Sequence, residues 1–218
     1  MDGKARSRSI ARSRTAVKTV PGATLVGSIT PPESIDIYIE APSRMSHPHK
    51  ASTVSQPPID PKVSIGHVHL KVADLERSLA FYCGVLGFEL TQRLGSQAAF
   101  VSAGGYHHHI GLNTWESRGG SPPPPGSTGL FHVAILYPSR ALLADALGRL
   151  LAASIPLDGA SDHGVSEAIY LRDPDGNGVE LYWDKPKEQW PRAADGSLAM
   201  FTHALDLDGL LMASPVKP

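Results

Sequence analysis

The sequence has little of several features that would assign a protein to a class. Its 218 residues include one cysteine, Cys83, so neither an intrachain disulfide framework nor a metal site made only of thiolates can form. No run approaches the roughly 18 consecutive apolar residues of a membrane span. Basic and acidic residues number 20 and 21, which leaves no charge excess to bind nucleic acid or an anionic membrane. We therefore expect a soluble, cytoplasmic protein, whose ten histidines need an explanation.

The first 62 residues differ in composition from the rest of the chain. Residues 1–20 contain six Lys and Arg residues and only one acidic residue. Residues 41–61 contain five prolines among Ser, His and Gln. Such segments bury too little apolar surface to offset the entropy that ordering costs. We expect a disordered extension over 1–62, with Met45 as an alternative start and a basic arm or transit peptide as an alternative role. Residues 191–218 are expected to form a C-terminal tail.

The central residues, 63–190, repeat one order of elements. Alternating apolar residues predict a strand over 65–72. Apolar residues at helical spacing then predict a helix from the candidate N-cap Asp74 to Gly87. Further strands are expected over 88–93, 98–103 and 106–113. The second copy has a strand, a helix and two strands around the tight turn DPDGNG, over 129–137, 139–153, 166–173 and 179–183. This order predicts an internal duplication, with modules 63–114 and 128–186.

Three candidate metal ligands occupy related positions in the two modules. His67 alternates with the apolar residues of its strand, and His132 holds the same place 65 residues later. Glu180 alternates in the same way in the last strand. Two imidazoles and a carboxylate on facing strands make the facial triad typical of non-haem Fe(II) sites, although Zn(II) or Mn(II) would accept the same ligands. A single strand histidine is more often only a hydrogen-bond partner, so the prediction depends on the equivalence of His67 and His132.

The first-module counterpart of Glu180 is Gly111, in the sequence HIGL. A glycine offers no fourth ligand, so a bound metal would keep open positions. Open positions suit a bidentate substrate together with dioxygen. A metal that only polarises its substrate, as in isomerisation, would instead need a fourth side chain.

Residues 64 to about 190 resemble the vicinal oxygen chelate superfamily (glyoxalase, bleomycin resistance protein, dioxygenase), and within it the extradiol dioxygenases of the catechol 2,3-dioxygenase type. The segments HVHLKVADLERSLAFYCGVLGF and DPDGNGVELYW are similar to ones shared across the superfamily. The segments YHHHIGLNTW and SDHGVSEAIYLRDPDGNGVEL are similar to those that carry active-site residues in extradiol enzymes. The resemblance implies an α+β fold in which two tandem βαβββ modules form one domain, with a metal in the shared cleft.

The resemblance also implies individual roles. It implies an Fe(II) site, or a Mn(II) site, with the ligands His67, His132 and Glu180. His108 would take or return substrate protons, since an imidazole titrates near pH ~6.5. His163 and Tyr170 would donate hydrogen bonds to negative charge developing on oxygen. Because His108 is the middle one of three consecutive histidines, its role requires a bulge or a strand end, and a surface histidine tract is the alternative.

The expected function is therefore Fe(II)-dependent extradiol ring cleavage of a small aromatic diol by O2, in a homodimer or larger homo-oligomer. Two other functions stay open. A metal-dependent lyase or isomerase of the glyoxalase type would need a fourth ligand and would consume no oxygen. A non-catalytic protein that sequesters a small molecule in the same cleft would bind no metal.

Overall fold

A computed structural model of the chain describes residues 57–214, so the predictions for residues 1–56 and for the last four residues lie outside the described residues. The first module contains β1 (Val68–Lys71), α1 (Leu75–Leu79), the π-helical turn η1 (Ala80–Val85), β2 (Glu89–Leu94), β3 (Ala98–Ser102) and β4 (Ile110–Asn113). The second contains β5 (Val133–Leu136), α2 (Arg140–Ala152), β6 (Leu157–Asp162), β7 (Ser166–Arg172) and β8 (Gly178–Asp184). The 3-10 turn η2 (Lys187–Gln189), β9 (His203–Ala204) and α3 (Leu207–Leu211) follow. The predicted α+β fold of two βαβββ modules is confirmed.

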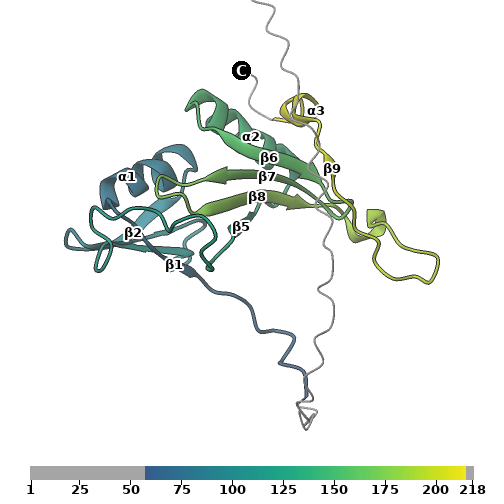
Figure 1. Cartoon of the computed structure of the whole chain (residues 1–218). Helices are drawn as coiled ribbons and strands as arrows, with labels where there is room; N and C mark the ends of the chain where they lie inside the picture. The colour runs from purple at the N-terminus through teal and green to yellow at the C-terminus, as the bar shows by residue number, and fades with distance from the viewer. Residues whose placement is uncertain (1–56, 215–218) are drawn as a thin grey trace, which may run out of the picture. The chain divides into compact units, whose positions relative to one another are not determined.

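The two modules have the same sheet topology. The first sheet has the order β1-β4-β3-β2 and the second the order β5-β8-β7-β6-β9 (Figure 1). In each sheet the first strand of the module pairs in parallel with the last, and the other pairs are antiparallel. Over the described residues no helix combines the length and the apolarity that crossing a membrane would require.

Several elements differ from the sequence prediction. The helix expected up to Gly87 changes from α to π geometry after Leu79, and the strand expected from residue 106 begins only at Ile110. Neither β6 nor β9 was predicted, because their sequences, LDGASD and HA, have no apolar alternation. β6 becomes a strand through the hairpin that it forms with β7, and β9 becomes one through pairing with β6, which lies far earlier in the sequence.

Local chemistry sets the helix ends as predicted. The Asp74 carboxylate accepts a hydrogen bond from the Arg77 backbone N–H at 3.0 Å, and Ser139 caps α2 in the same way. Gly87 has φ +86°, which favours glycine at this position after the helix. A Cβ there would lie 2.7 Å from the Arg149 guanidinium, so the close packing of α2 on this turn also favours glycine.

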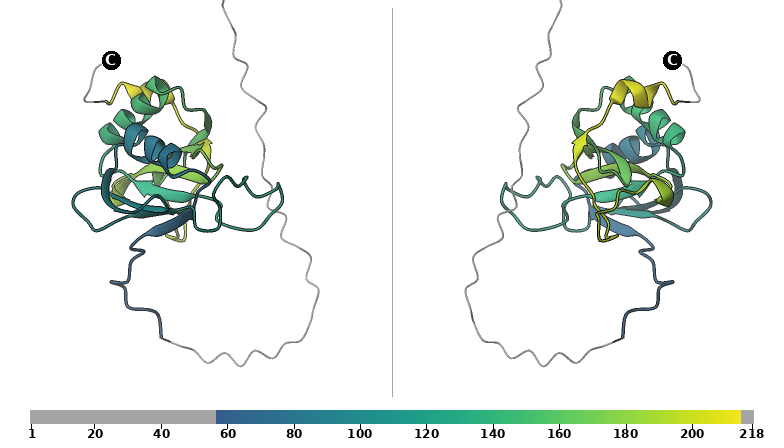
Figure 2. Two further views of the ribbon diagram at one scale, coloured as in Figure 1. Left: turned by 90° about the vertical axis from the view of Figure 1, so that its left-hand side faces the viewer. Right: turned by 90° about the vertical axis from the view of Figure 1, so that its right-hand side faces the viewer.

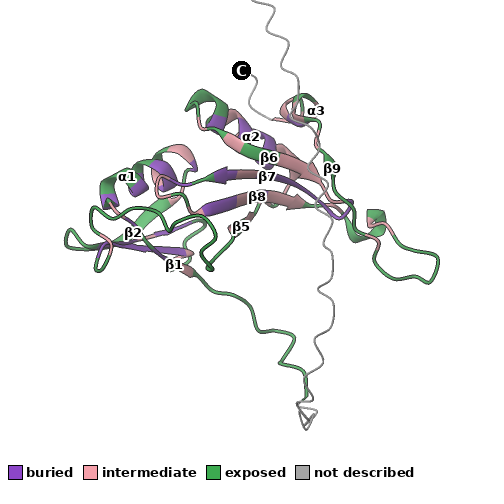
Figure 3. Cartoon of the chain, viewed as in Figure 1, coloured by how far each residue is buried: buried purple, intermediate pink, exposed green. Residues whose placement is uncertain are grey.

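The two modules share one hydrophobic core. Helices α1 and α2 lie on the same side of the sheets (Figures 1 and 2), and their inner faces are buried (Figure 3). The core joins fully buried side chains of both modules, among them Val72, Tyr82, Leu112, Leu143, Leu147, Ile169 and Leu181. Burial of this apolar surface is the main favourable term for docking one module on the other.

The turn between β7 and β8 ties the second module to η1 of the first. The Asp173 carboxylate accepts from the backbone N–H groups of Asp175 and Asn177, both at 2.9 Å, and from the Tyr82 hydroxyl at 3.0 Å. Burial, and then the nearby Asp173 charge, raises the pKa of Tyr82, so its hydroxyl keeps its proton and donates. Asp173 thereby both shapes the turn and binds a fully buried side chain of the other module.

Asp175, in the same turn, binds the start of α1. Its carboxylate accepts from the Ala73 backbone N–H at 3.0 Å and pairs with the Arg77 guanidinium. The Ser78 hydroxyl lies 3.4 Å from its other oxygen. The carboxylate is largely buried, with 10% of its side chain exposed, so these contacts are little screened by water.

We expect Asp175→Ala to lower the free energy of unfolding by about 1–3 kcal/mol, because a part-buried backbone N–H would lose its acceptor. Urea unfolding followed by circular dichroism measures this loss. Asp158→Ala is the matched control, since Asp158 forms an ion pair with Arg172 in which both side chains are nearly half exposed. The free energy of unfolding of Asp158→Ala should fall by less than about 1 kcal/mol. Equal losses in the two variants would contradict a docking role for Asp175.

Candidate functional site

His132 and Glu180 form the most closely joined part of the candidate site. His132 directly precedes β5, and Glu180 lies within the adjacent strand β8. His132 Nε2 and Glu180 Oε2 are 2.9 Å apart. Gly178 permits this approach of the two strands, because a Cβ there would lie 2.0 Å from the Phe131 carbonyl oxygen and 3.0 Å from the His132 Cβ. The glycine that ends the DPDGNG turn therefore helps to place a candidate ligand.

Tyr170 and His163 extend this pair into a chain of hydrogen bonds. Tyr170 is the register partner of Glu180 in the β7–β8 ladder, and its hydroxyl donates to Glu180 Oε1 at 3.2 Å. His163 Nε2 lies 2.7 Å from the same hydroxyl. Burial, and then the Glu180 charge, raises the pKa of Tyr170, so the phenol stays protonated. Four of the predicted site residues are thus connected in one module: His132, Glu180, Tyr170 and His163.

The other two predicted site residues, His67 and His108, lie together in the first module. Their ring centroids are 4.3 Å apart, and the His108 ring also lies 4.9 Å from that of Phe100. His107 Nδ1 is 2.7 Å from His108 Nδ1, a distance at which one nitrogen donates and the other accepts. Partial burial, and then the neighbouring His67 and His107, lower the pKa of His108. A lowered pKa favours the uncharged form of His108, which can accept a proton.

The three consecutive histidines have different surroundings. They precede β4, which begins at Ile110, so strand alternation does not fix their directions. His109 turns toward β3, where its Nδ1 lies 3.0 Å from the Ser102 hydroxyl. The strand end that the role of His108 required is therefore present.

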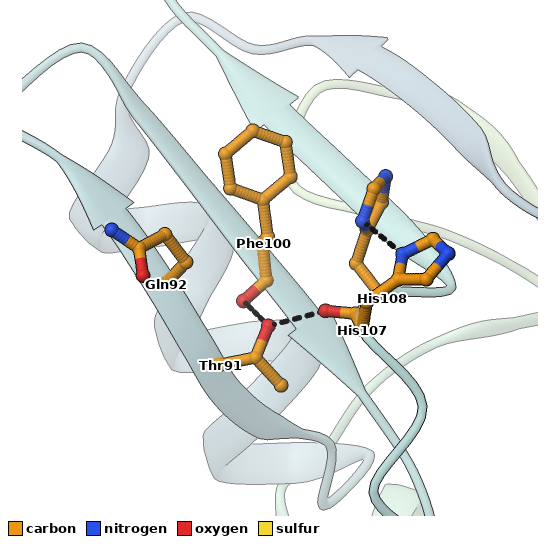
Figure 4. A pocket seen from close by; sticks show the side chains of 5 residues that line it. All are labelled: Thr91, Gln92, Phe100, His107 and His108. Atoms are coloured by element: carbon orange, nitrogen blue, oxygen red, sulfur yellow. Dashed lines mark hydrogen bonds between the residues drawn. The ribbon is translucent and has the colours of Figure 1, made fainter.

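A hollow of about 440 Å³ adjoins His108 and His107 (Figure 4). Thr91 and Gln92 of β2 and Phe100 of β3 complete its lining. The Thr91 hydroxyl lies 2.8 Å from the His107 carbonyl oxygen, which holds the histidine segment against β2. The sequence analysis did not select these three residues, although Phe100 alternates with the buried Ala99 and Val101 and could have been assigned to the open face.

Equivalent positions of the two sheets carry opposite combinations of large and small residues. In the first sheet His69 is the register partner of Gly111, and in the second Ala134 is the partner of Glu180. This register supports the equivalence of Gly111 and Glu180 that the duplication predicts. A Cβ on Gly111 would lie 2.9 Å from the His69 ring, so this imidazole fills the place in which a side chain at position 111 would lie.

The donor atoms fit a metal in part. Two ligand atoms bound at about 2.1 Å to one ion, at right angles, lie about 3 Å apart, so His132 Nε2 and Glu180 Oε2 suit adjacent ligand positions. His132 Nδ1 is buried without a hydrogen-bond partner among the described residues. Within residues 57–214 no group of three or more His, Cys, Asp or Glu side chains is arranged to hold a metal ion. The structure thus joins two of the three predicted ligands and leaves His67 beside His108, and the three-residue set stays a prediction.

We expect Gly111→Ala to destabilise the protein by about 1–3 kcal/mol, because the new methyl group would overlap the His69 ring. When His69 is already alanine, adding Gly111→Ala should lower the free energy of unfolding much less than it does in the unmodified chain. Urea unfolding of both single variants and the double variant measures this coupling. Additive losses would mean that His69 does not limit the space at position 111. Gly159→Ala, where a Cβ would contact nothing within 4 Å, is the control.

Comparison with known proteins identifies the family. The model of the Glyoxalase/Bleomycin resistance protein/Dioxygenase superfamily matches residues 64–181. A protein of Bacillus subtilis (strain 168) named catechol-2,3-dioxygenase is 44% identical over 148 residues, which cover 67% of this chain and 50% of that protein. Biphenyl-2,3-diol 1,2-dioxygenase 2 of Rhodococcus globerulus is 30% identical over 118 residues, which cover 54% and 61%.

The chain therefore spans about half to three-fifths of the length of these two curated relatives. A crystal structure of a glyoxalase/dioxygenase from Nostoc punctiforme matches with a TM-score of 0.50 at 20% identity, over 60% of this chain and 99% of that one. This likeness supports the fold. The family match covers the strands and turns that carry His67, His132, Tyr170 and Glu180. The chain therefore belongs to the glyoxalase, bleomycin resistance protein and dioxygenase superfamily.

Proposed function

We propose that this protein is an Fe(II)-dependent extradiol dioxygenase that opens the ring of a catechol-like aromatic with O2. The observation that carries the proposal is the hydrogen-bonded chain His132–Glu180–Tyr170–His163. It occurs in a sequence 44% identical to a relative named catechol-2,3-dioxygenase. Gly111, with the His69 ring over it, supports the same reaction, because it leaves no fourth protein ligand at that position.

In this proposal His67, His132 and Glu180 hold Fe(II), with Mn(II) as the alternative. The metal would supply the redox chemistry that joins an aromatic diol to dioxygen. Tyr170 holds the Glu180 carboxylate through its hydroxyl, and such an outer contact orients a ligand and tunes its basicity.

In this proposal His108 is the general base. Its Nδ1–H donates to His107 Nδ1, so that Nε2 carries no proton and can accept one from a diol hydroxyl in the adjoining hollow. The hollow of about 440 Å³ beside His108 would give that hydroxyl access to the imidazole ring. Tyr170, whose hydroxyl donates to Glu180 in the structure, and His163, which lies 2.7 Å from that hydroxyl, would turn their protons toward negative charge that develops on oxygen.

The test begins with anaerobic loading of the full chain with Fe(II), followed by measurement of oxygen uptake with catechol and simple substituted catechols. We expect uptake to match the appearance of a yellow ring-opened acid. Glu180→Gln should lower this rate by more than about 100-fold. Loss of a residue that only hydrogen-bonds a metal ligand already lowers metal affinity or activity by up to about that factor. Glu188→Gln, at an exposed carboxylate of η2, is the matched control and should keep the rate.

Two outcomes would overturn the proposal. Metal binding without oxygen uptake across the catechol panel would favour a lyase or isomerase of the same superfamily. Failure to bind Fe(II), Mn(II) or Zn(II) would favour a protein that sequesters a small molecule.

We further expect Tyr170→Phe to lower kcat by about 100-fold with little change in KM for catechol, because a single donor to developing negative charge has about this effect. Steady-state oxygen uptake by the Fe(II)-loaded protein separates the two constants. Tyr137→Phe is the control, since Tyr137 packs against the hydrophobic core. A rise in KM with kcat unchanged would assign Tyr170 to substrate binding instead.

A further inference from the structure

The segment that follows the family match is firmly attached to the second module. Strand β9 pairs with β6 through His203 and Ala204, and the next helix, α3, buries Leu210 completely. The Arg140 guanidinium of α2 donates to the Gly209 carbonyl oxygen at 3.1 Å. These contacts hold the residues just before β9 against the second sheet.

Phe201 and Thr202, which directly precede β9, contact His163. His163 Nδ1 lies 3.2 Å from the Phe201 carbonyl oxygen and 3.2 Å from the Thr202 hydroxyl. The Phe201 backbone N–H donates to the His163 carbonyl oxygen at 3.3 Å. Gly164, at φ +77°, makes this approach feasible, because a Cβ there would lie 2.7 Å from the Phe201 ring. His163 is therefore held from both sides, by Tyr170 at Nε2 and by the tail at Nδ1.

The donors and acceptors around the ring decide where its proton lies. Glu180, as a carboxylate, only accepts, so the Tyr170 hydroxyl gives its one proton to Glu180. The Tyr170 oxygen must then accept from His163 Nε2–H. A neutral His163 with its proton on Nε2 has a bare Nδ1, which needs a donor. Of the two tail groups within reach, only the Thr202 hydroxyl can donate, because the other is a carbonyl oxygen.

We propose that Thr202 is a positioning residue for His163. Its hydroxyl donates to Nδ1 and so fixes the neutral ring in the tautomer that carries its proton on Nε2, toward Tyr170. When the ring is charged, Nδ1–H donates to the Phe201 carbonyl oxygen instead. Both states of His163 thus have partners at both nitrogens, and the ring can gain or lose a proton without turning.

The tautomer can be measured without activity. The full chain, labelled with 15N at histidine and freed of metal by EDTA, is studied by NMR at about pH 8.5, well above the ordinary imidazole pKa of about 6.5. The signals of His163 are assigned by their loss in His163→Gln. We expect the Nε2–H tautomer in the unmodified chain and in Thr202→Ser. In Thr202→Val, which keeps the shape but removes the hydroxyl, Nδ1 loses its donor. We then expect a shift to the Nδ1–H tautomer bonded to the Phe201 carbonyl oxygen, with the Tyr170 hydroxyl turning its proton from Glu180 to His163 Nε2.

An unchanged tautomer in Thr202→Val, or an Nδ1–H tautomer in the unmodified chain, would overturn the proposal. Thr202→Ala repeats the loss of the hydroxyl with a smaller side chain, so a packing defect specific to valine would be recognised. Thr202 is exposed, and we expect both variants to unfold at the same urea concentration as the unmodified chain.

The catalytic consequence rests on the proposed function. With the Fe(II)-loaded protein and catechol, Thr202→Val should lower kcat by about 10-fold at unchanged KM, whereas Thr202→Ser should restore it. If no variant and no unmodified protein consumes oxygen, the proposed function fails. The tautomer of His163 still decides the role of Thr202 in that case.

Discussion

The carboxylates of Asp173 and Asp175 hold the two modules in one arrangement. Both lie in the turn between β7 and β8, yet they bind the buried Tyr82 hydroxyl and the Ala73 backbone N–H just before α1. Apolar burial favours docking of the modules in many orientations, whereas these directional bonds specify one. The candidate site depends on this docking, because His67 and His108 come from the first module and the other four predicted residues from the second.

The sequence predicted those parts of the fold that local chemistry controls. Asp74, Gly87 and the DPDGNG turn have the residue types that a helix start, a helix end and a tight connection require, and the structure has each of them there. The duplication was recognisable because both copies keep the same alternation of apolar residues. Strands β6 and β9 were missed, because their own residues have no apolar alternation and only pairing with β7 and β6 makes them strands. The π geometry of η1 likewise has no signal in its residues.

The candidate site was likewise predictable where strand alternation controls it, and not where packing between separate segments does. Strand alternation placed Glu180 and Tyr170 on one face, and their register in the β7–β8 ladder brings their oxygens within hydrogen-bond distance. Strand alternation and the duplication predicted that His132 and Glu180 lie together, but they did not predict that His67 lies against His108 instead. Nor could they predict that a tail residue would contact His163, because that contact requires the tail to fold back so that β9 pairs with β6. The hollow beside His108 depends on loop directions that the sequence does not specify.

The exchange of bulk between positions 69/111 and 134/180 makes the residues at positions 69 and 111 dependent on each other. A carboxylate side chain at position 111 would meet the His69 ring, so it could enter only together with a smaller residue at position 69. The second sheet has this combination, with Ala134 beside Glu180. To give the first module a carboxylate like that of the second therefore requires two coordinated substitutions.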